Sequence, residues 1–435
     1  MRTNQVVTVN QGGKPNKSFL DLLAEYRAGV FSYQSIAVGF FKSLSEFHQN
    51  LILKLLCGDS LFLNQVLVHG PDYQAKINEI DDKLYNKVKV VDKSESEDGR
   101  VKYKLEKTFA ESIKSFLSKG LNGIFQVMST FEKCVKSSKA MEESLKSHAF
   151  AKWNNMHKYM LKQTTFVQGV EDLSVQVVQT LEETGLIMKE GRNNSSCFDF
   201  LLDNIKNQVS IFLYGYTKRI IKMRHNYKRK VAGGQEEAIY EGDILNLIFH
   251  LTLLYPQVSY SLSKSQESLN ELKLTTEVIN DILEDLWSVG LVKCKRGDDG
   301  KVKNFATTPL IHNIFNPNAL LERGFKNDII VETDFNIYAY STNLDYIEAL
   351  LGLFTAIKFK LPSMVICSLE EDKIRRAFEI GITPEQILRY LNSNTHKEVM
   401  KSKNHLMNDQ EIADAEKNYS YLPTNIVQQV KIWNL

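Results

Sequence analysis

Residues 328–391 read DIIVETDFNIYAYSTNLDYIEALLGLFTAIKFKLPSMVICSLEEDKIRRAFEIGITPEQILRYL, and this stretch decides the predicted fold. Two short runs rich in β-branched and aromatic residues, 329–331 and 337–340, flank a turn-prone segment and predict a hairpin. Apolar residues then recur at helical spacing from 344 to 357, and Pro362 lies beyond the expected end of that helix. Residues 364–369 are predicted to form a third strand.

Cap signals predict two further helices after the third strand. Ser368 and Glu371 stand in the S-x-x-E spacing of a helix start, and Gly381 lies where that helix is expected to stop. Thr383-Pro384-Glu385-Gln386 repeats the pattern, with proline at the first helical position. The predicted unit is therefore β-β-α-β-α-α. Its hairpin edge is neither charged nor blocked by proline, so either it pairs with another sheet or the chain covers it.

Length and composition indicate several globular domains without a strong overall charge. A chain of 435 residues exceeds the size at which one core keeps growing, and 43% of its residues are hydrophobic. The net charge is +2, so any binding to nucleic acid or membrane has to be local. The polar residues 1–17 lack the apolar core of a signal peptide, and the longest apolar run, 244–255, is too short to cross a bilayer. We therefore expect a soluble protein with a disordered N-terminus.

A helix followed by a two-stranded hairpin recurs three times and matches the outline of a winged-helix module. The units, each given as helix, first strand and second strand, are 73–85, 88–91 and 101–105; 171–184, 185–187 and 197–200; and 275–289, 290–292 and 302–307. The predicted fold class is α+β and mainly helical, with tandem winged-helix modules followed by a small β-β-α-β-α-α docking domain. The predicted divisions are a disordered N-terminus (1–17), a first winged-helix-like module (18–110), a helical region with a second module (111–235), a third module (236–313), a linker (314–327), the docking domain (328–400), a connector (401–421) and a terminal helix (422–435).

The acidic character of the module helices argues against DNA reading. The helix at 275–289 carries four acids and no Lys or Arg, and the helix at 171–184 is equally acidic. Lys and Arg supply most of the affinity for phosphates, so such helices are repelled from a duplex. We interpret the modules as protein-interaction platforms. The alternative is a tandem winged-helix DNA-binding transcription regulator, which tight, steeply salt-dependent gel shifts would reveal.

One basic cluster stands at the end of a helix that begins near residue 205. The structural interpretation is a solvated helix C-terminus, where cations suit the helix dipole. The functional interpretation is a nucleic-acid contact or a nuclear-import patch. Its members are Lys218, Arg219, Lys222, Arg224, Lys228, Arg229 and Lys230.

Patterns typical of catalysis or of cofactor binding do not occur in the sequence. The string nearest to a phosphate-binding loop, 297–301, is followed by Val302 where a metal-binding hydroxyl is required. The five cysteines are far apart and have no histidine at ligand spacing, which is typical of reduced thiols. We therefore expect no enzyme activity, no cofactor and no metal.

Five motifs together resemble one known family. They are Ile329-Ile-Val-Glu-Thr333, Ile337-Tyr-Ala-Tyr340, Leu361-Pro-Ser-Met-Val365, Gly381-Ile-Thr-Pro-Glu-Gln-Ile387 and Leu422-Pro-Thr-Asn-Ile-Val-Gln-Gln-Val-Lys-Ile-Trp433. They look like the core subunit of the general transcription and DNA-repair factor TFIIH that anchors the XPB translocase and stimulates its ATPase. The resemblance implies a non-catalytic nuclear scaffold, which acts in promoter opening for RNA polymerase II and in nucleotide excision repair.

The resemblance also implies a partner site on the docking domain. In that family this domain pairs with a similarly folded N-terminal domain of XPB, other TFIIH core subunits are further partners, and contact with DNA is expected to be indirect or weak. Relatives can carry a basic residue at the position of Asn336. This sequence departs from them there, because asparagine is neutral. The matched positions at or beside the contact are Glu332, Thr333, Asp334, Asn336, Tyr338 and Tyr340.

The predicted terminal helix has an apolar face that requires a partner. This face needs a partner or a following domain to bury it. Its residues are Ile426, Val427, Val430 and Trp433. The resembled family continues into a small C-terminal domain that pairs with the smallest TFIIH subunit. Since this sequence stops at Leu435, we expect that partner only if the native chain contains such a domain.

Overall fold

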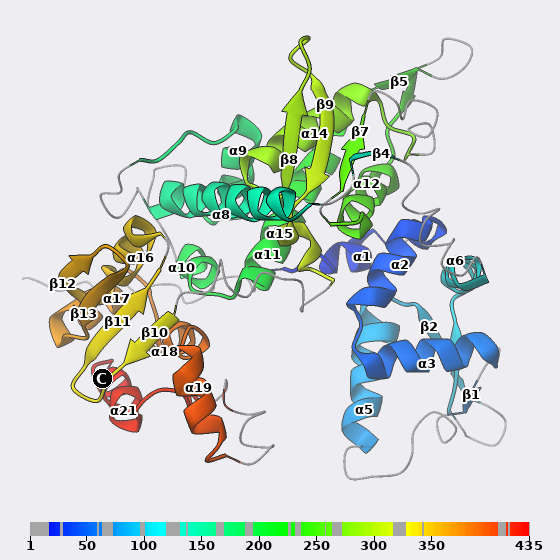
Figure 1. The fold of residues 1–435 in the computed structure, drawn as a ribbon. Helices are drawn as coiled ribbons and strands as arrows, with labels where there is room; N and C mark the ends of the chain where they lie inside the picture. Colours follow the sequence, from blue (N-terminus) through cyan, green and yellow to red (C-terminus); the bar gives the residue numbers. More distant parts are fainter. Residues whose placement is uncertain are drawn as a thin grey trace, which may run out of the picture.

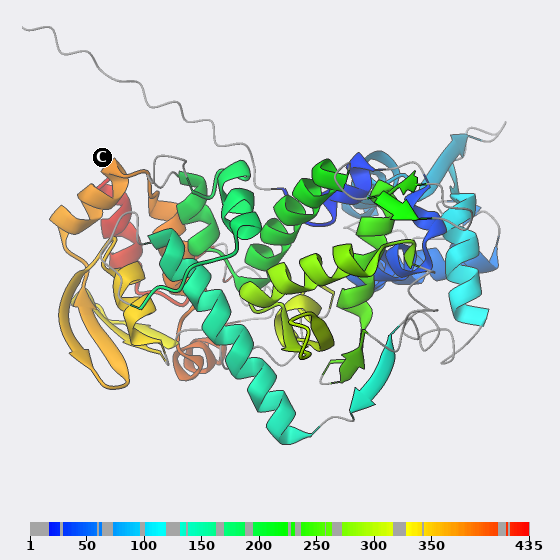
Figure 2. The same cartoon turned by 90° about the horizontal axis from the view of Figure 1, so that it is seen from above.

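A computed structural model provides the structure of the chain. It describes residues 17–26, 29–58, 61–62, 73–95, 101–118, 131–135, 138–161, 169–187, 195–224, 228–230, 236–256, 258–262, 272–315, 328–341, 343–407, 415 and 418–434. The described residues form a mainly helical α+β structure with small antiparallel sheets, which confirms the predicted class. A first module and the docking domain lie at opposite ends of a central body (Figures 1 and 2).

The first module combines helices with a three-stranded sheet. Strand β2 (Val91–Glu95) pairs antiparallel with β3 (Val101–Leu105), which confirms a hairpin here, although its first strand lies later than the predicted 88–91. Strand β1 (Leu61–Phe62) pairs with the other edge of β3. Buried Tyr103 of β3 donates its hydroxyl hydrogen bond to Asp81 at 2.8 Å and fixes the sheet to the preceding helix. The helical elements are α1 (Asp21–Glu25), η1 (Val30–Ser32), α2 (Gln34–Ser43), α3 (Glu46–Cys57), α5 (Tyr73–Ile80), η2 (Asp81–Lys87) and α6 (Lys107–Ser118).

The central body contains the second sheet, with strand order β4-β7-β9-β8. The pairing of β8 (Val292–Arg296) with β9 (Val302–Thr307) confirms the third hairpin and its second strand, although the first strand lies later than the predicted 290–292. Strands β7 (Ser259–Ser261) and β4 (Glu132–Val135) extend this sheet. A separate short hairpin joins β5 (Lys228–Lys230) to β6 (Glu236–Ala238). The helices are α8 (Lys139–Leu161), α9 (Val175–Glu183), α10 (Ser195–Leu201), α11 (Ile205–Met223), α12 (Glu241–Leu253), α14 (Thr276–Ser288) and α15 (Pro309–His312).

The second predicted hairpin is wrong, because residues 197–200 lie in helix α10 rather than in a strand. Cys197, Phe198 and Leu201 are buried there at one-turn spacing. Phe198 and Phe200 alternate with a polar residue, as they would in a strand. Both side chains are nevertheless buried in helix α10. The described residues of 169–224 are therefore helices and turns, without a wing.

One acid of the predicted acidic face on α14 lies inside the protein. The carboxylate of Asp285 is 8% exposed and accepts hydrogen bonds from Ser174 at 2.9 Å and Tyr216 at 3.0 Å. Burial raises the pKa of Asp285 to about 6, although these hydrogen bonds oppose the rise. Asp285 therefore joins α14 to the start of α9 and to α11.

The docking domain has four strands, so the predicted order β-β-α-β-α-α is wrong by one strand. The sheet order is β10-β11-β13-β12, formed by β10 (Asp328–Val331), β11 (Asn336–Tyr340), β13 (Met364–Ser368) and β12 (Ala356–Leu361). The pairing of β10 with β11 confirms the first hairpin. Helix α16 (Leu344–Leu351) stops well before residue 357, and Ile357 lies in β12 opposite Cys367.

Caps explain the other boundaries of the docking domain. Thr383 and Gln386 form the predicted capping box of α18 (Pro384–Ser393), with reciprocal hydrogen bonds of 2.7 and 3.3 Å. Helix α17 (Glu371–Glu379) ends before Gly381, as predicted, where φ is +96°. The predicted cap at Ser368 is wrong, because this residue ends β13 and its hydroxyl donates to Glu370. Helix α19 (Lys397–Asn404) follows.

The chain covers the outer edge of β10 itself. The backbone N–H of Ile329 donates to the carbonyl of Asn394 at 2.8 Å, and the N–H of His396 donates to the carbonyl of Ile329 at 2.8 Å. These bonds make a short parallel bridge between Ile329 and Thr395. Of the two edges of this sheet, only the β12 edge has no strand partner among the described residues.

The terminal helix α21 (Thr424–Ile432) packs on the docking domain, so the prediction that its apolar face needs an outside partner is wrong. Ile426 and Val430 are fully buried. The Trp433 ring lies 5.7 Å from Phe335, which has a left-handed φ of +71° in the turn between β10 and β11. Asn425 donates to the carbonyl of Thr333 at 2.8 Å. Helix α21 therefore supports the hairpin turn.

Aromatic packing joins the docking domain to the central body. The rings of His157 on α8 and Tyr346 on α16 are 5.1 Å apart, and both side chains are buried. Lys158 lies 3.7 Å from Asp345, and Gln386 of α18 hydrogen-bonds Asp199 of α10. Because these contacts involve two helices on each side, the docking domain has a fixed orientation on the body.

Replacement of Trp433 by alanine tests the support of the hairpin turn. The side chain is half-buried, so Trp433→Ala is expected to lower the free energy of unfolding by about 2 kcal/mol, below the range for a fully buried tryptophan. Amide hydrogen exchange at residues 332–336 is expected to accelerate, and Trp433→Phe is expected to retain most of the protection. Unchanged exchange in the alanine variant would mean that the turn is stable without the ring.

The buried imidazole of His157 makes stability depend on pH. Burial lowers the pKa of His157 to about 3, whereas the unfolded value is 6.5. Between pH 6.5 and about 3 the unfolded chain therefore binds a proton that the folded protein excludes, which destabilises the fold by up to about 1.4 kcal/mol per pH unit. His157→Gln is expected to reduce this loss, measured by urea unfolding at pH 7.5 and 5.5 with the fluorescence of the neighbouring Trp153. Equal losses in both proteins would contradict this role.

Candidate functional site

The outer face of the docking sheet is a candidate binding surface. Side chains alternate along a strand, so Ile337 and Ala339 of β11 face the helices and are fully buried. Asn336, Tyr338 and Tyr340 lie on the opposite face. The register places Ile366 and Met364 of β13 beside the two tyrosines, and Phe359 and Leu361 of β12 beyond them. One sheet face thus carries a nearly continuous apolar surface.

This face is exposed most strongly at its free edge. Phe359 is 63% exposed, Leu361 40% and Tyr340 39%. Contiguous exposed apolar groups next to an unpaired edge are typical of protein-interaction sites. Sequence reasoning missed Phe359 and Leu361 because residues 344–357 were assigned to one long helix. The alternating string Ile-Lys-Phe-Lys-Leu at 357–361 was the available signal for a strand.

The structure brings all six predicted partner residues into one hairpin. Glu332, Thr333 and Asp334 are exposed in the turn, and the other three lie on the outer face of β11. The carboxylate of Glu332 raises the pKa of the exposed Tyr338 hydroxyl. The amide of Asn336 donates to Asp334 at 2.6 Å. The turn thus presents two carboxylates next to the tyrosine-bearing strand.

A lysine from another strand lies beside Asn336. The ammonium group of Lys358 in β12 donates to Oδ1 of Asn336 at 2.9 Å. A positive charge is therefore present next to this position, although the residue at 336 is neutral. The sequence alone does not reveal this cation, because the two residues are 22 positions apart and meet only through the sheet.

Four members of the basic cluster form ion pairs within the protein. Lys218 lies 2.9 Å from Glu25, Arg219 pairs with Glu183, Lys222 lies 3.7 Å from Glu183, and Arg224 lies 2.8 Å from Glu241. Their charges thus connect α11 to α1, α9 and α12. The side chains of Lys228, Arg229 and Lys230 lie outside the described residues, so a nucleic-acid or import role stays a prediction for them.

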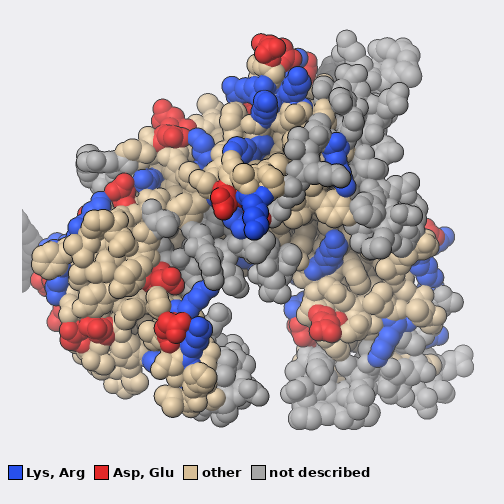
Figure 3. Space-filling view, in the orientation of Figure 1, with Lys and Arg blue, Asp and Glu red and all other residues tan. Residues whose placement is uncertain are grey.

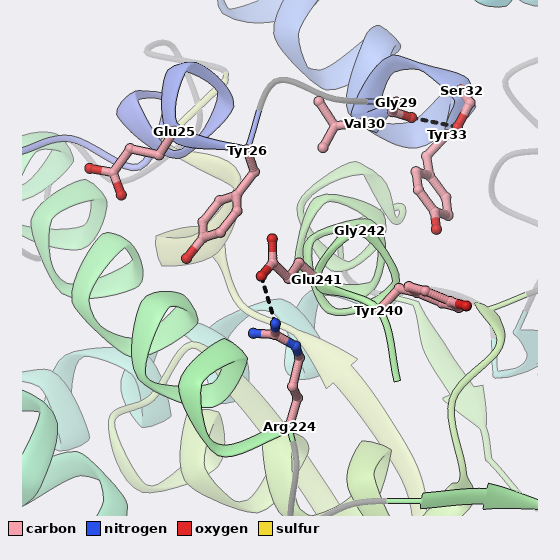
Figure 4. Close-up of a pocket in the computed structure, with 10 residues that line it drawn as sticks. All are labelled: Glu25, Tyr26, Gly29, Val30, Ser32, Tyr33, Arg224, Tyr240, Glu241 and Gly242. Atoms are coloured by element: carbon pink, nitrogen blue, oxygen red, sulfur yellow. Dashed lines mark hydrogen bonds and ion pairs between the residues drawn. The ribbon is translucent and has the colours of Figure 1, made fainter. Parts of the chain in front are cut away.

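A cavity of about 500 Å³ lies between the segment 25–33 and the start of α12 (Figure 4). Its charged groups are already paired, because Arg224 binds Glu241 and Glu25 binds Lys218. Burial raises the pKa of Glu25, but hydrogen bonds from Lys17 and Lys218 outweigh this effect and hold it at about 2. The charged side chains of the cavity are therefore engaged with one another rather than free for a ligand.

The described part of the chain offers neither a metal site nor a membrane span. None of its groups of His, Cys, Asp and Glu could hold a metal ion. Within the same residues, no helix combines the length and apolar character needed to cross a membrane. The docking sheet thus remains the strongest candidate for a functional surface.

Comparisons with known proteins agree on one family. A family model described as Transcription factor Tfb2 matches residues 19–397. The relatives named General transcription and DNA repair factor IIH subunit TFB2 include that of Arabidopsis thaliana (27% identical, 56% of this chain and 45% of the relative), that of Eremothecium gossypii (26%, 76% and 66%) and that of Yarrowia lipolytica (27%, 67% and 56%). The match thus spans about half to two thirds of these relatives. Because the family model covers most of the sequence, the chain belongs to the Tfb2 family of transcription factors.

Proposed function

We propose that this chain is a non-catalytic scaffold subunit of TFIIH in the nucleus. It acts in promoter opening by RNA polymerase II and in DNA opening during nucleotide excision repair. Three relatives carry names that place them in the general transcription and DNA repair factor IIH, which supports this role. Other core subunits of that complex are its proposed partners.

The proposed site for the N-terminal domain of XPB is the outer face of the docking sheet. The observation that carries this assignment is the exposed apolar surface of β11, β13 and β12, which ends at the β12 edge, where no strand of the described residues pairs. Tyr338, Tyr340 and Phe359 supply aromatic groups of the kind that dominate binding energy at interfaces. Glu332 and Asp334 at one end and Lys358 nearby add charges that select the orientation of the partner.

The fixed orientation of the docking domain supports an indirect effect on ATP turnover. Contacts between α8 and α16 join the docking sheet to the body, so a motor domain held there keeps one position relative to the other modules. A scaffold stimulates a motor only when it binds the active arrangement more tightly than the inactive one. We propose that the docking domain stimulates XPB in this way.

We further interpret the first module and the α14-β8-β9 unit as winged-helix-like protein platforms. Their acidic groups form contacts within each unit: Asp81 lies 2.6 Å from Lys93, and Glu284 lies 3.3 Å from Arg296. Glu277 and Asp281 stay exposed on α14, where a DNA-reading helix needs cations. These charges disfavour the alternative of a sequence-reading DNA regulator.

A double charge reversal tests the proposed contact. Glu332→Lys with Asp334→Lys is expected to weaken binding to the XPB N-terminal domain about tenfold, or about 1.4 kcal/mol, and to reduce ATPase stimulation in parallel. Calorimetric titration and ATP hydrolysis assays measure the two effects. The matched control is Glu111→Lys with Glu379→Lys, which reverses two exposed acids elsewhere. Equal affinity in test and control variants, with folding intact, would exclude the hairpin as the contact.

A rescue experiment tests the role of Lys358. If this cation replaces the basic residue missing at 336, Lys358→Gln is expected to weaken binding by the same order as one lost charge pair, and Asn336→Arg in that background is expected to restore it. Asn336→Gln serves as the neutral control. Failure of arginine to improve on glutamine would show that positive charge at this place is irrelevant to binding.

A further inference from the structure

The β8–β9 hairpin of the central sheet carries a local excess of positive charge. Residues 292–303 contain five basic residues against two acids, a net charge of +3, whereas the whole chain has +2. The acids are Asp298 and Asp299 in the turn. The basic residues are Lys293, Lys295, Arg296, Lys301 and Lys303.

Three of these charges have no acidic partner in the described part of the chain. They belong to the exposed residues Lys295, Lys301 and Lys303, and none of these three forms an ion pair with another described residue. Arg296 lies 3.3 Å from Glu284 and over the ring of Trp287, and Lys293 donates to Ser144 at 2.6 Å. The hairpin projects beyond the body in Figure 1, and Figure 3 shows basic side chains gathered below its acidic tip.

A groove beside the hairpin adds polar groups to this surface. It has a volume of about 190 Å³ and lies between the start of α8 and the sheet. Ser144, Ser259 and Asn304 line it together with Lys293 and Lys295, and its remaining lining residues are apolar: Met141, Leu145, Cys294, Phe305 and Ala306. Hydroxyl and amide groups next to lysines are the usual donors to phosphate oxygens in nucleic-acid complexes.

The surface fits a nucleic-acid backbone better than an acidic peptide. None of the described residues of β8 and β9 is an exposed large hydrophobic, so the hairpin itself offers a bound peptide no exposed apolar anchor. Lys293 and Lys295 share one face of a strand at a spacing of ~7 Å. A row of cations without apolar anchors suits a polymer with regularly spaced negative charges.

We propose that the β8–β9 hairpin makes a sequence-independent contact with the phosphate backbone of duplex DNA. The β8–β9 hairpin makes this contact and α14 does not, because the exposed carboxylates of Glu277 and Asp281 repel phosphates from that helix. The contact is weak, since it involves few cations, and it is separate from the docking sheet. It lets the scaffold hold DNA and its protein partner at two different surfaces.

The test uses the full chain and a short fluorescent DNA duplex, with anisotropy measured at several salt concentrations. The variant Lys295→Gln, Lys301→Gln and Lys303→Gln is expected to lower the slope of log affinity against log salt by about 1 for each lysine. Asp298→Asn with Asp299→Asn is expected to tighten binding. Unlabelled duplexes of different sequence are expected to compete equally.

A matched control removes the same charge elsewhere. Lys54→Gln, Lys107→Gln and Lys114→Gln alter exposed lysines of the first module, and this variant is expected to keep the slope of the unmodified protein. Equal slopes in the hairpin variant and the unmodified protein would overturn the proposal. Salt-dependent binding to a polyglutamate peptide, without binding to the duplex, would instead identify an acidic protein segment as the partner and would equally overturn it.

Discussion

Burial of the long helix α8 is the constraint on which the other parts depend. At 23 residues it extends roughly 34 Å, and it touches the central sheet, α11 and the docking domain. His148 hydrogen-bonds the carbonyl of Val292 at 3.2 Å, Trp153 donates to Gln208 at 3.2 Å, and His157 packs against Tyr346. A helix with contacts along its length cannot shift at one end without loss of contacts at the other, so α8 links the docking domain to the central body.

Contacts between distant parts of the chain decide which charged side chains are exposed and unpaired. The sequence predicts an acidic surface on α14 and a basic surface at the end of α11. Asp285 instead accepts hydrogen bonds in the interior, and Arg219 pairs with Glu183 on α9. The lysines of the β8–β9 hairpin form no continuous run in the sequence, because other residues separate them. Pairing in space decides which charges remain available to a partner.

Local signals predicted the docking domain well where one turn or one cap determines the structure. The first hairpin, the capping box at Thr383 and Gln386 and the stop at Gly381 all follow from neighbouring residues. Strand β12 was missed because its apolar residues continue the helical spacing of α16, and only pairing with β13 selects the strand. The six hairpin residues of the candidate site came from family resemblance. Phe359, Leu361 and Lys358 required the sheet register, which a single sequence does not specify.

The position of α21 affects the order in which contacts of the docking domain form during synthesis. Asn425 contacts the hairpin turn across 92 positions of sequence, and Trp433 covers Phe335 from still further along the chain. Domains form in the order in which they leave the ribosome. The docking hairpin is therefore made long before the helix that holds its turn, and the turn lacks this support until residues 424–433 have emerged. The contacts that support the turn are thus among the last of the docking domain to form as the chain is made.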